Sequence, residues 1–206
     1  DVVYNGANEE YRPVSESEQQ EIRNKYTGGA PYFLFVSTIH QRKNVANLFR
    51  AFDLFRKKTA SAYKLVLAGH KKWMSEEITN AYNNMQFKDD VVFLGRVPSD
   101  ELKKVTGSAL AMTYVSFFEG FGVPVLESMY CDVPVITSNI TSMPEVAGDA
   151  ALLADPFSVE SISDAMLKVS SDVALRNKLI ENGRVQRQQF TWDKTAERLW
   201  QSIENV

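Results

Sequence analysis

Short runs of apolar residues alternate along the chain with longer segments in which apolar residues recur every three or four positions. The short runs are rich in Val, Leu and Phe, and their apolar residues are continuous rather than alternating with polar ones. This pattern is typical of strands that are covered on both faces. It predicts strands at Tyr32–Ser37, Lys64–Ala68, Val91–Leu94, Leu110–Val115, Val133–Thr137 and Ala151–Leu153.

The segments between these runs have helical patterns. One apolar stripe with the spacing i, i+3, i+4, i+7 consists of Val45, Leu48, Phe49, Phe52 and Phe55. Further helices are predicted near residues 75–85, 99–106, 123–131, 159–170, 172–189 and 192–204. The alternation predicts an α/β fold with a Rossmann-like parallel sheet of about six strands and helices on both faces. Ligands of such sheets bind at the carboxyl ends of the strands, so the loops after the strands are the candidate sites.

Composition narrows the class of protein. The chain has 206 residues, of which 44% are hydrophobic and 24% charged, which predicts one globular domain over residues 1–206. A net charge of -3 argues against nucleic acid as a partner, because a general binder of polyanions is normally basic. No apolar run approaches the roughly 18 residues that span a membrane, so we expect a soluble protein. The single cysteine and the two histidines have no partners at metal-ligand spacing, so we expect no metal.

The first residues suggest a longer protein. The chain starts with Asp1 rather than Met, and residues 1–6 have the pattern of a strand end that leads into an Asn–Gly turn. We therefore expect a fragment of a longer chain.

One candidate motif, Glu119–Glu127, follows the fourth predicted strand and enters a helix. Its glycines let the backbone approach a ligand closely, and Pro124 suits a first helical turn. Glu119 is placed to hold sugar hydroxyls, and Glu127, expected in the first turn of the helix, could accept hydrogen bonds from a ribose diol. The alternative is a tight turn followed by a carboxylate that complements the helix dipole.

A second motif, residues 37–44, follows the first predicted strand. Arg42 and Lys43 are expected at the start of the next helix, on the same sheet edge as Glu119. Two cations at this edge suit a diphosphate whose negative charge rises as it departs. The alternative is a pair of solvent-facing helix charges. At a third junction, the backbone of residues 95–97 could frame a flat heterocycle, although by itself it is an ordinary strand–loop–helix connection.

Several common motifs are missing from the sequence. No Gly-x-Gly-x-x-Gly follows a strand and no Gly-x-x-x-x-Gly-Lys-Ser/Thr occurs, which argues against a dinucleotide-binding dehydrogenase and a P-loop NTPase. Gly-x-Ser-x-Gly is also missing, so an α/β-hydrolase has no support.

From about Asn5 to its end, the chain resembles the C-terminal, donor-binding half of a family 4 (group 1) glycosyltransferase with the GT-B fold. The most specific segment is residues 119–138, which matches the family's Glu-x7-Glu motif and the strand after it. Residues 42–44, Met143–Ala151 and Phe190–Asp193 support the match. The resemblance implies a retaining glycosyltransferase that moves a hexose from a nucleotide-diphosphate sugar, with GDP-mannose favoured, and needs no metal cofactor.

The resemblance also implies roles for individual residues. Catalysis is assigned to Lys43 and Arg42 at the diphosphate leaving group and to Glu119 at the donor sugar. Donor binding is assigned to the ribose contact Glu127, the base contact Val97, the backbone of the glycine loop and the neighbouring loop positions: Thr38, Gly120, Phe121, Gly122 and Val123. One departure concerns the residues after the first strand, where many relatives carry Gly-Arg and this chain has Ser37-Thr38. It leaves open which cation, Arg42 or Lys43, is the main diphosphate contact.

The resemblance implies a setting and leaves two alternatives. The acceptor is expected to be a glycan or a lipid-linked glycan bound through an N-terminal half, so the isolated chain is expected to be inactive. The intact enzyme is expected in the cytoplasm, where it could attach peripherally to the inner membrane face. The alternatives are a GT-B sugar-nucleotide epimerase and a non-catalytic nucleotide-sugar binding module.

Overall fold

The fold is a single parallel sheet between layers of helices. The computed structural model describes residues 1–71 and 74–204. Within these ranges, six strands pair in parallel in the order β3-β2-β1-β4-β5-β6. The strands are β1 (Tyr32–Val36), β2 (Lys64–Ala68), β3 (Val91–Gly95), β4 (Ala111–Tyr114), β5 (Val135–Ser138) and β6 (Ala151–Ala154). The predicted strands are confirmed, with ends that agree within two residues and, for β2, coincide.

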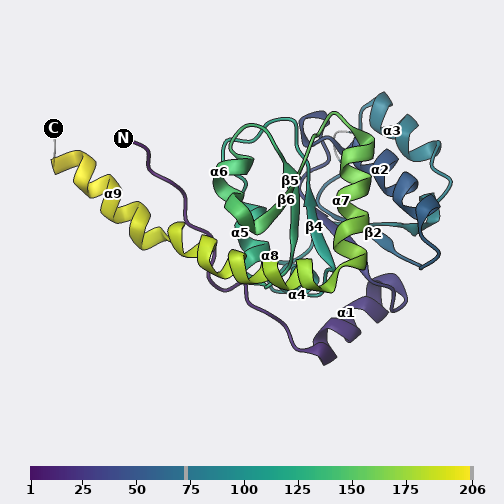
Figure 1. Ribbon diagram of the computed structural model, residues 1–206, viewed down its shortest axis with the longest axis horizontal. Helices are drawn as coiled ribbons and strands as arrows, with labels where there is room; N and C mark the ends of the chain where they lie inside the picture. The colour runs from purple at the N-terminus through teal and green to yellow at the C-terminus, as the bar shows by residue number, and fades with distance from the viewer. Residues whose placement is uncertain (72–73, 205–206) are drawn as a thin grey trace.

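Helices cover both faces of the sheet, as predicted. In Figure 1, α2 (Val45–Lys58), α3 (Glu76–Asn83) and α7 (Val159–Ser171) lie on one side of the strands, and α5 (Val123–Tyr130) and α6 (Met143–Ala147) lie on the other. Of the remaining helices, α4 (Ser99–Gly107) packs against α1 (Glu16–Thr27) and α5, and α8 (Val173–Gln186) packs against α5 and α7.

The predicted apolar stripe of α2 forms the centre of the core. Its five side chains, from Val45 to Phe55, are fully buried against β1 and β2 and the neighbouring helices. Phe33 of β1 contacts Phe55 edge to face, with 5.2 Å between the ring centroids. Burying each such side chain contributes roughly 1.5–3 kcal/mol, so this stripe anchors α2 and, with it, the loop that connects β1 to α2.

Two helices lie outside the predicted ranges. α1 has few apolar residues and therefore no clear periodicity, but Ser15 and Glu18 form a capping box: the Glu18 amide donates to Ser15 Oγ at 3.3 Å and the Ser15 amide donates to Glu18 Oε2 at 3.1 Å. The Ser-x-x-Glu pattern was the available signal for this helix. α6 has only five residues, which is too short for a periodic pattern.

The N-terminal residues do not form the expected strand end. Residues 1–8 are neither strand nor helix. They run beside α9 (Trp192–Glu204), where Thr195 Oγ1 donates to the Tyr4 carbonyl at 2.6 Å (Figure 1). Gly6 lies so close to this helix that a Cβ there would be 2.5 Å from the Trp192 backbone nitrogen. Close packing against α9, rather than strand pairing, therefore explains the extended start of the chain.

Among the described residues, the helices are too short or too polar to cross a bilayer.

Candidate functional site

The candidate site lies where the strand order reverses. β1 and β4 are neighbours in the sheet, while the chain continues from β1 toward one edge and from β4 toward the other. The loops after these two strands meet at the carboxyl edge, where the Phe117 amide donates to the Arg42 carbonyl at 3.0 Å. Open α/β sheets bind their ligands at such a switch point.

Asn44 holds three loops together at this edge. Its side-chain amide donates to the carbonyl of Val115 after β4 at 2.9 Å and to the carbonyl of Pro156 after β6 at 2.7 Å. Its backbone has a φ of 58°, in the left-handed region that asparagine tolerates better than most residues. The sequence pattern predicts no role for Asn44 by itself, although its place beside Arg42 and Lys43 was a signal.

Lys43, Arg42 and Glu119 are in direct contact. Lys43 Nζ lies 2.7 Å from Glu119 Oε1, and Arg42 Nη1 lies 3.0 Å from Glu119 Oε2. Arg42 Nη1 also donates to the Phe118 carbonyl at 2.6 Å. Lys43 and Glu119 are 9% and 7% exposed, whereas the Arg42 side chain is 44% exposed. Two cations share one carboxylate, so the cluster keeps one positive charge in excess for an anionic ligand.

The two cations do not stand in the first turn of the helix, as the sequence pattern predicts. They belong to a 3-10 turn, Gln41–Lys43, that precedes α2. His40 begins this turn, and its Nδ1 accepts a hydrogen bond from the Arg42 amide at 3.1 Å. The 3-10 turn that His40 begins thus places the two cations at the sheet edge rather than along α2.

For both Lys43 and Glu119, burial and the neighbouring charges shift the pKa in opposite directions. Burial lowers the pKa of Lys43, and the contact with Glu119 opposes that effect. Burial also acts to raise the pKa of Glu119, but hydrogen bonds from Lys43 and Arg42 outweigh it and the pKa is lowered overall. A bound anion would add negative charge beside Lys43 and favour its ammonium form.

The glycine loop before α5 presents its backbone toward the same edge. Gly122 has a φ of 104°, and a Cβ there would lie 2.4 Å from Met143 Cε, so this position requires glycine. Beside Gly120 there is open space, since no atom lies within 4 Å of the position that a Cβ would take. The Phe121 ring packs away from the edge against Phe190, with 5.6 Å between ring centroids. Val123 then begins α5, and Pro124 follows in the first turn, where its missing N–H has no cost.

A cavity of about 330 Å³ lies over the ends of β1, β2 and β3. Thr38 and Val97 are on its wall, as the base-binding role expected of Val97 requires. The lining consists of Val36, Ser37, Thr38, Ala68, Gly69, His70, Arg96, Val97 and Leu102. A lining that combines apolar side chains with a few polar ones suits a flat heterocycle. Thr38 connects this cavity to the loop that carries Arg42 and Lys43.

Glu127 lies elsewhere than its place in the motif predicts. It is in the second turn of α5, not the first, and α5 has no acidic residue in its first turn. Its carboxylate lies beside the Tyr11 hydroxyl of the N-terminal segment, and it is not among the described residues that line the 330 Å³ cavity. Burial raises the pKa of Glu127 to about 7, and the hydrogen bond with Tyr11 partly offsets this. A role in complementing the helix dipole does not fit this position.

The raised pKa of Glu127 predicts a stability effect that depends on pH. Unfolding returns the carboxyl to the ordinary value of 4.5, so between about pH 4.5 and 7 the unfolded state ionises first and the folded state is progressively destabilised. Glu127→Gln, which stays neutral, should therefore raise the melting temperature above that of the wild type at pH 7.5 and have little effect at pH 4. The stability difference should reach at most about 3 kcal/mol. Parallel melting curves across this range would contradict the assignment.

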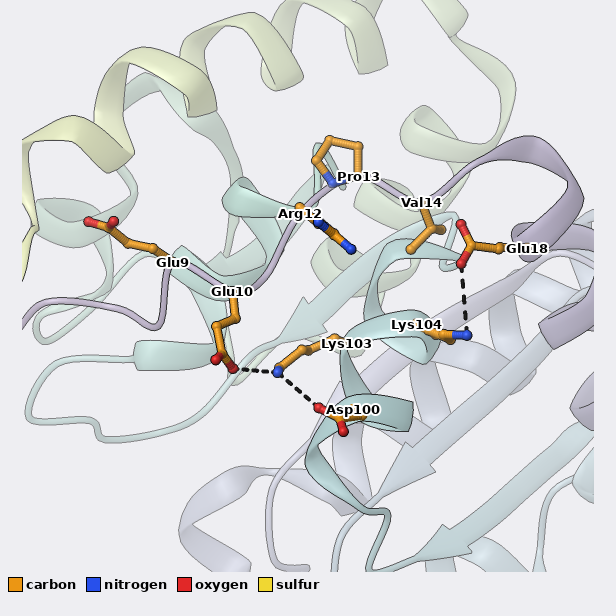
Figure 2. A pocket seen from close by; sticks show the side chains of 9 residues that line it. All are labelled: Glu9, Glu10, Arg12, Pro13, Val14, Glu18, Asp100, Lys103 and Lys104. Carbon is orange, nitrogen blue, oxygen red and sulfur yellow. Dashed lines mark hydrogen bonds and ion pairs between the residues drawn. The ribbon is translucent and has the colours of Figure 1, made fainter.

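A second cavity, of about 460 Å³, lies between the N-terminal segment and α4 (Figure 2). Both of its lysines pair with carboxylates: Lys103 Nζ lies 2.5 Å from Glu10 and 3.1 Å from Asp100, and Lys104 Nζ lies 3.8 Å from Glu18. These pairs neutralise the lysines, so this cavity lacks the positive excess of the switch-point cluster. They fasten the N-terminal segment to α4.

Known proteins share both the sequence pattern and the fold of this chain. Residues 16–186 match the family model described as glycosyl transferases group 1. The chain belongs to the group 1 glycosyltransferases. It is 36% identical over 185 residues to O-antigen chain mannosyltransferase B of Escherichia coli, covering 89% of this chain and 49% of that protein. The chain therefore spans about half the length of this curated relative.

Solved structures share the fold of this group 1 glycosyltransferase chain. HepE of Anabaena, in complex with UDP and glucose, has a TM-score of 0.87 at 17% identity, and the match covers 100% of this chain and 57% of HepE. The C-terminal domain of the group 1 glycosyltransferase LpcC from Francisella tularensis has a TM-score of 0.76 at 23% identity, covering 89% of this chain and 97% of that domain. These matches confirm the predicted Rossmann-like α/β fold.

Proposed function

We propose that this chain is the donor-binding half of a retaining hexosyltransferase that uses a nucleoside-diphosphate sugar, with GDP-mannose favoured. The observation that carries the proposal is the contact of Lys43 and Arg42 with Glu119 at the switch point, next to a glycine loop and a cavity suited to a base. The name of the Escherichia coli relative, a mannosyltransferase, supports a hexose. The UDP and glucose in the HepE complex support a nucleotide-sugar donor.

The cations would act on the leaving group. When the bond between the anomeric carbon and the diphosphate oxygen breaks, its electron pair stays on that oxygen and the negative charge of the diphosphate increases. Lys43 and Arg42 are already held in place, so they stabilise this charge more in the transition state than in the bound donor. The oxygen of the acceptor hydroxyl then forms the new bond to the anomeric carbon, and its proton passes to the departing diphosphate.

Glu119 would have two successive partners. Without a ligand, its carboxylate accepts hydrogen bonds from both cations. A bound diphosphate carries more negative charge than one carboxylate, so it would replace Glu119 as the partner of the two cations. Glu119 could then accept hydrogen bonds from sugar hydroxyls. The open space beside Gly120 leaves room for the sugar next to this carboxylate.

The direct test is a thermal-shift comparison of UDP, GDP and ADP, their sugar conjugates and the matching monophosphates on this chain. A nucleoside diphosphate at 100 times its Kd should add about 2.7 kcal/mol to stability, or roughly 5–10 °C in melting temperature. One diphosphate should raise the melting temperature clearly more than its monophosphate does. If no diphosphate shifts the melting temperature more than its monophosphate does, the proposal is wrong.

Glu127 is proposed to bind the ribose hydroxyls, and the same comparison tests it. Glu127→Ala should weaken binding of the preferred diphosphate and should reduce its advantage over the 2′,3′-dideoxy analogue, because the lost partner is the diol. Binding through the ionised carboxylate should strengthen as the pH rises through about 7, where Glu127 loses its proton. Unchanged affinities for both GDP and UDP would contradict this role.

Transfer itself belongs to the longer protein. We propose a glycan or lipid-linked acceptor bound by a second domain, attachment of that protein at a cytoplasmic membrane face, no catalytic metal, and no turnover by this chain alone. Product analysis of the longer protein with and without acceptor separates transfer from epimerisation, which needs no second sugar.

A further inference from the structure

Tyr114 places a hydroxyl group at the centre of the cation cluster. It is the last residue of β4, is only 2% exposed, and stacks on Phe35 of the neighbouring strand with 6.2 Å between ring centroids. Its hydroxyl accepts a hydrogen bond from Lys43 Nζ at 2.6 Å. In the sequence this position is an ordinary strand residue, because nothing in a linear pattern distinguishes a buried ring from one whose hydroxyl reaches a site.

The position of this hydroxyl is fixed by the sheet. The Tyr114 carbonyl accepts a hydrogen bond from Thr137 Oγ1 at 2.8 Å, and Tyr114 is in register with Thr137 of β5. Burial and the nearby Glu119 carboxylate raise the pKa of Tyr114, so the phenol stays neutral, with its proton in reach of Glu119. The Tyr114 hydroxyl therefore accepts a hydrogen bond from the same ammonium that pairs with Glu119.

Lys43 needs such a fixed partner. A lysine ammonium sits on a flexible four-carbon stem, and ordering it has an entropic cost. In the unliganded protein, Glu119 and Tyr114 share this task. Under the proposed function, Glu119 turns to the sugar when the donor binds, and the Tyr114 hydroxyl stays where the sheet holds it.

We propose that Tyr114 is a positioning residue that keeps the Lys43 ammonium directed at the donor diphosphate after Glu119 has released it. This inference rests on the proposed function. It assigns Tyr114 no contact with the reacting atoms, and its effect is exerted through Lys43.

The experiment compares Tyr114→Phe with wild type by calorimetric titration of this chain with GDP, GMP, UDP and UMP. The substitution keeps the buried ring and removes only the hydroxyl. We expect the Kd of the preferred diphosphate to rise about tenfold and that of its monophosphate to change less than threefold, since the lost hydrogen bond is the one that directs the Lys43 ammonium toward the distal phosphate. A merely structural role would change both alike.

Tyr32→Phe is the matched control. Tyr32 is another buried tyrosine of the same sheet, and its hydroxyl donates to the Val105 carbonyl at 2.5 Å, away from the cations. Its loss should lower the melting temperature without changing the ratio of diphosphate to monophosphate affinity.

Glu119→Ala provides an independent test that leaves Tyr114 in place. It removes the acceptor that competes for Lys43, so Tyr114 alone should hold the ammonium, and affinity for the diphosphate should be kept or increased. A tenfold loss of diphosphate affinity in this variant would overturn the positioning role. So would an unchanged ratio of diphosphate to monophosphate affinity in Tyr114→Phe. In either case, diphosphate binding by the wild type would leave the proposed function standing. If wild type binds neither GDP nor UDP, both are wrong.

Discussion

Lys43→Ala should lower the turnover of a full-length enzyme that contains this chain by about two to three orders of magnitude. The expectation follows from the buried ammonium at the switch point, which is already positioned where charge develops on the leaving group. Removing one preorganised donor from a comparable oxyanion site costs about 2.7–4 kcal/mol of transition-state stabilisation. Arg42 is too exposed to replace it fully, since its side chain is 44% exposed and also holds the Phe118 carbonyl.

Steady-state kinetics with saturating donor and acceptor measure this effect, and Lys57→Ala is the control. Lys57 lies in the last turn of α2, at the opposite end of the helix from Lys43, and pairs with Asp53 at 2.7 Å. Its removal should change turnover by less than a factor of two, because it takes away a lysine charge far along the helix from the Lys43 and Glu119 contact. A change below about threefold for Lys43→Ala, with an intact fold in thermal melts, would contradict the leaving-group role and shift it to Arg42.

Gly69→Ala should be the most destabilising single change near the site. A Cβ at Gly69 would lie 1.9 Å from the Ser37 carbonyl oxygen, and its φ of 147° is rarely adopted by other residues. The obstructing atom is backbone, so the loop after β1 must move away from the end of β2. Backbone strain and overpacking together should cost about 3 kcal/mol or more, a drop of roughly 10 °C in melting temperature. The cavity that Gly69 lines should also lose its nucleotide affinity.

Gly120→Ala is the matched comparison for stability. No atom lies within 4 Å of the position that its Cβ would take. Its melting temperature should stay within about 2 °C of wild type, although the added methyl group enters the space proposed for the sugar. Similar melting temperatures for the two variants would mean that the loops after β1 and β2 are not in close contact.

The glycine-rich motif and the two cations could be found in the sequence because each follows a predicted strand. Their direct contact could not be found in this way. Lys43 and Glu119 are 76 residues apart, and they meet because β1 and β4 are neighbours in the sheet. Strand order depends on the packing of all the helices and strands together, and no local pattern reports it.

Glu127 and Tyr114 show that a sequence pattern does not give the direction of a side chain. The pattern misplaced Glu127 and overlooked Tyr114. The spacing of the motif suggested a first-turn position for Glu127 that the actual start of α5 at Val123 rules out. Tyr114 looked like one more apolar strand residue, yet its hydroxyl reaches Lys43. In both cases the decisive quantity is the direction of a side chain, which depends on where an element begins and on what packs against it.

By itself, the sequence determined the alternation of strands and helices, the buried face of α2 and the two loops that carry polar groups. These follow from local rules: continuous apolar runs favour buried strands, and a stripe of period 3.6 favours a helix packed on one side. The tertiary structure alone decided that one carboxylate holds two cations, that Asn44 joins three loops and that Glu127 is half-buried beside Tyr11. Those contacts join residues distant in the chain, and only the packed sheet brings their side chains within reach of one another.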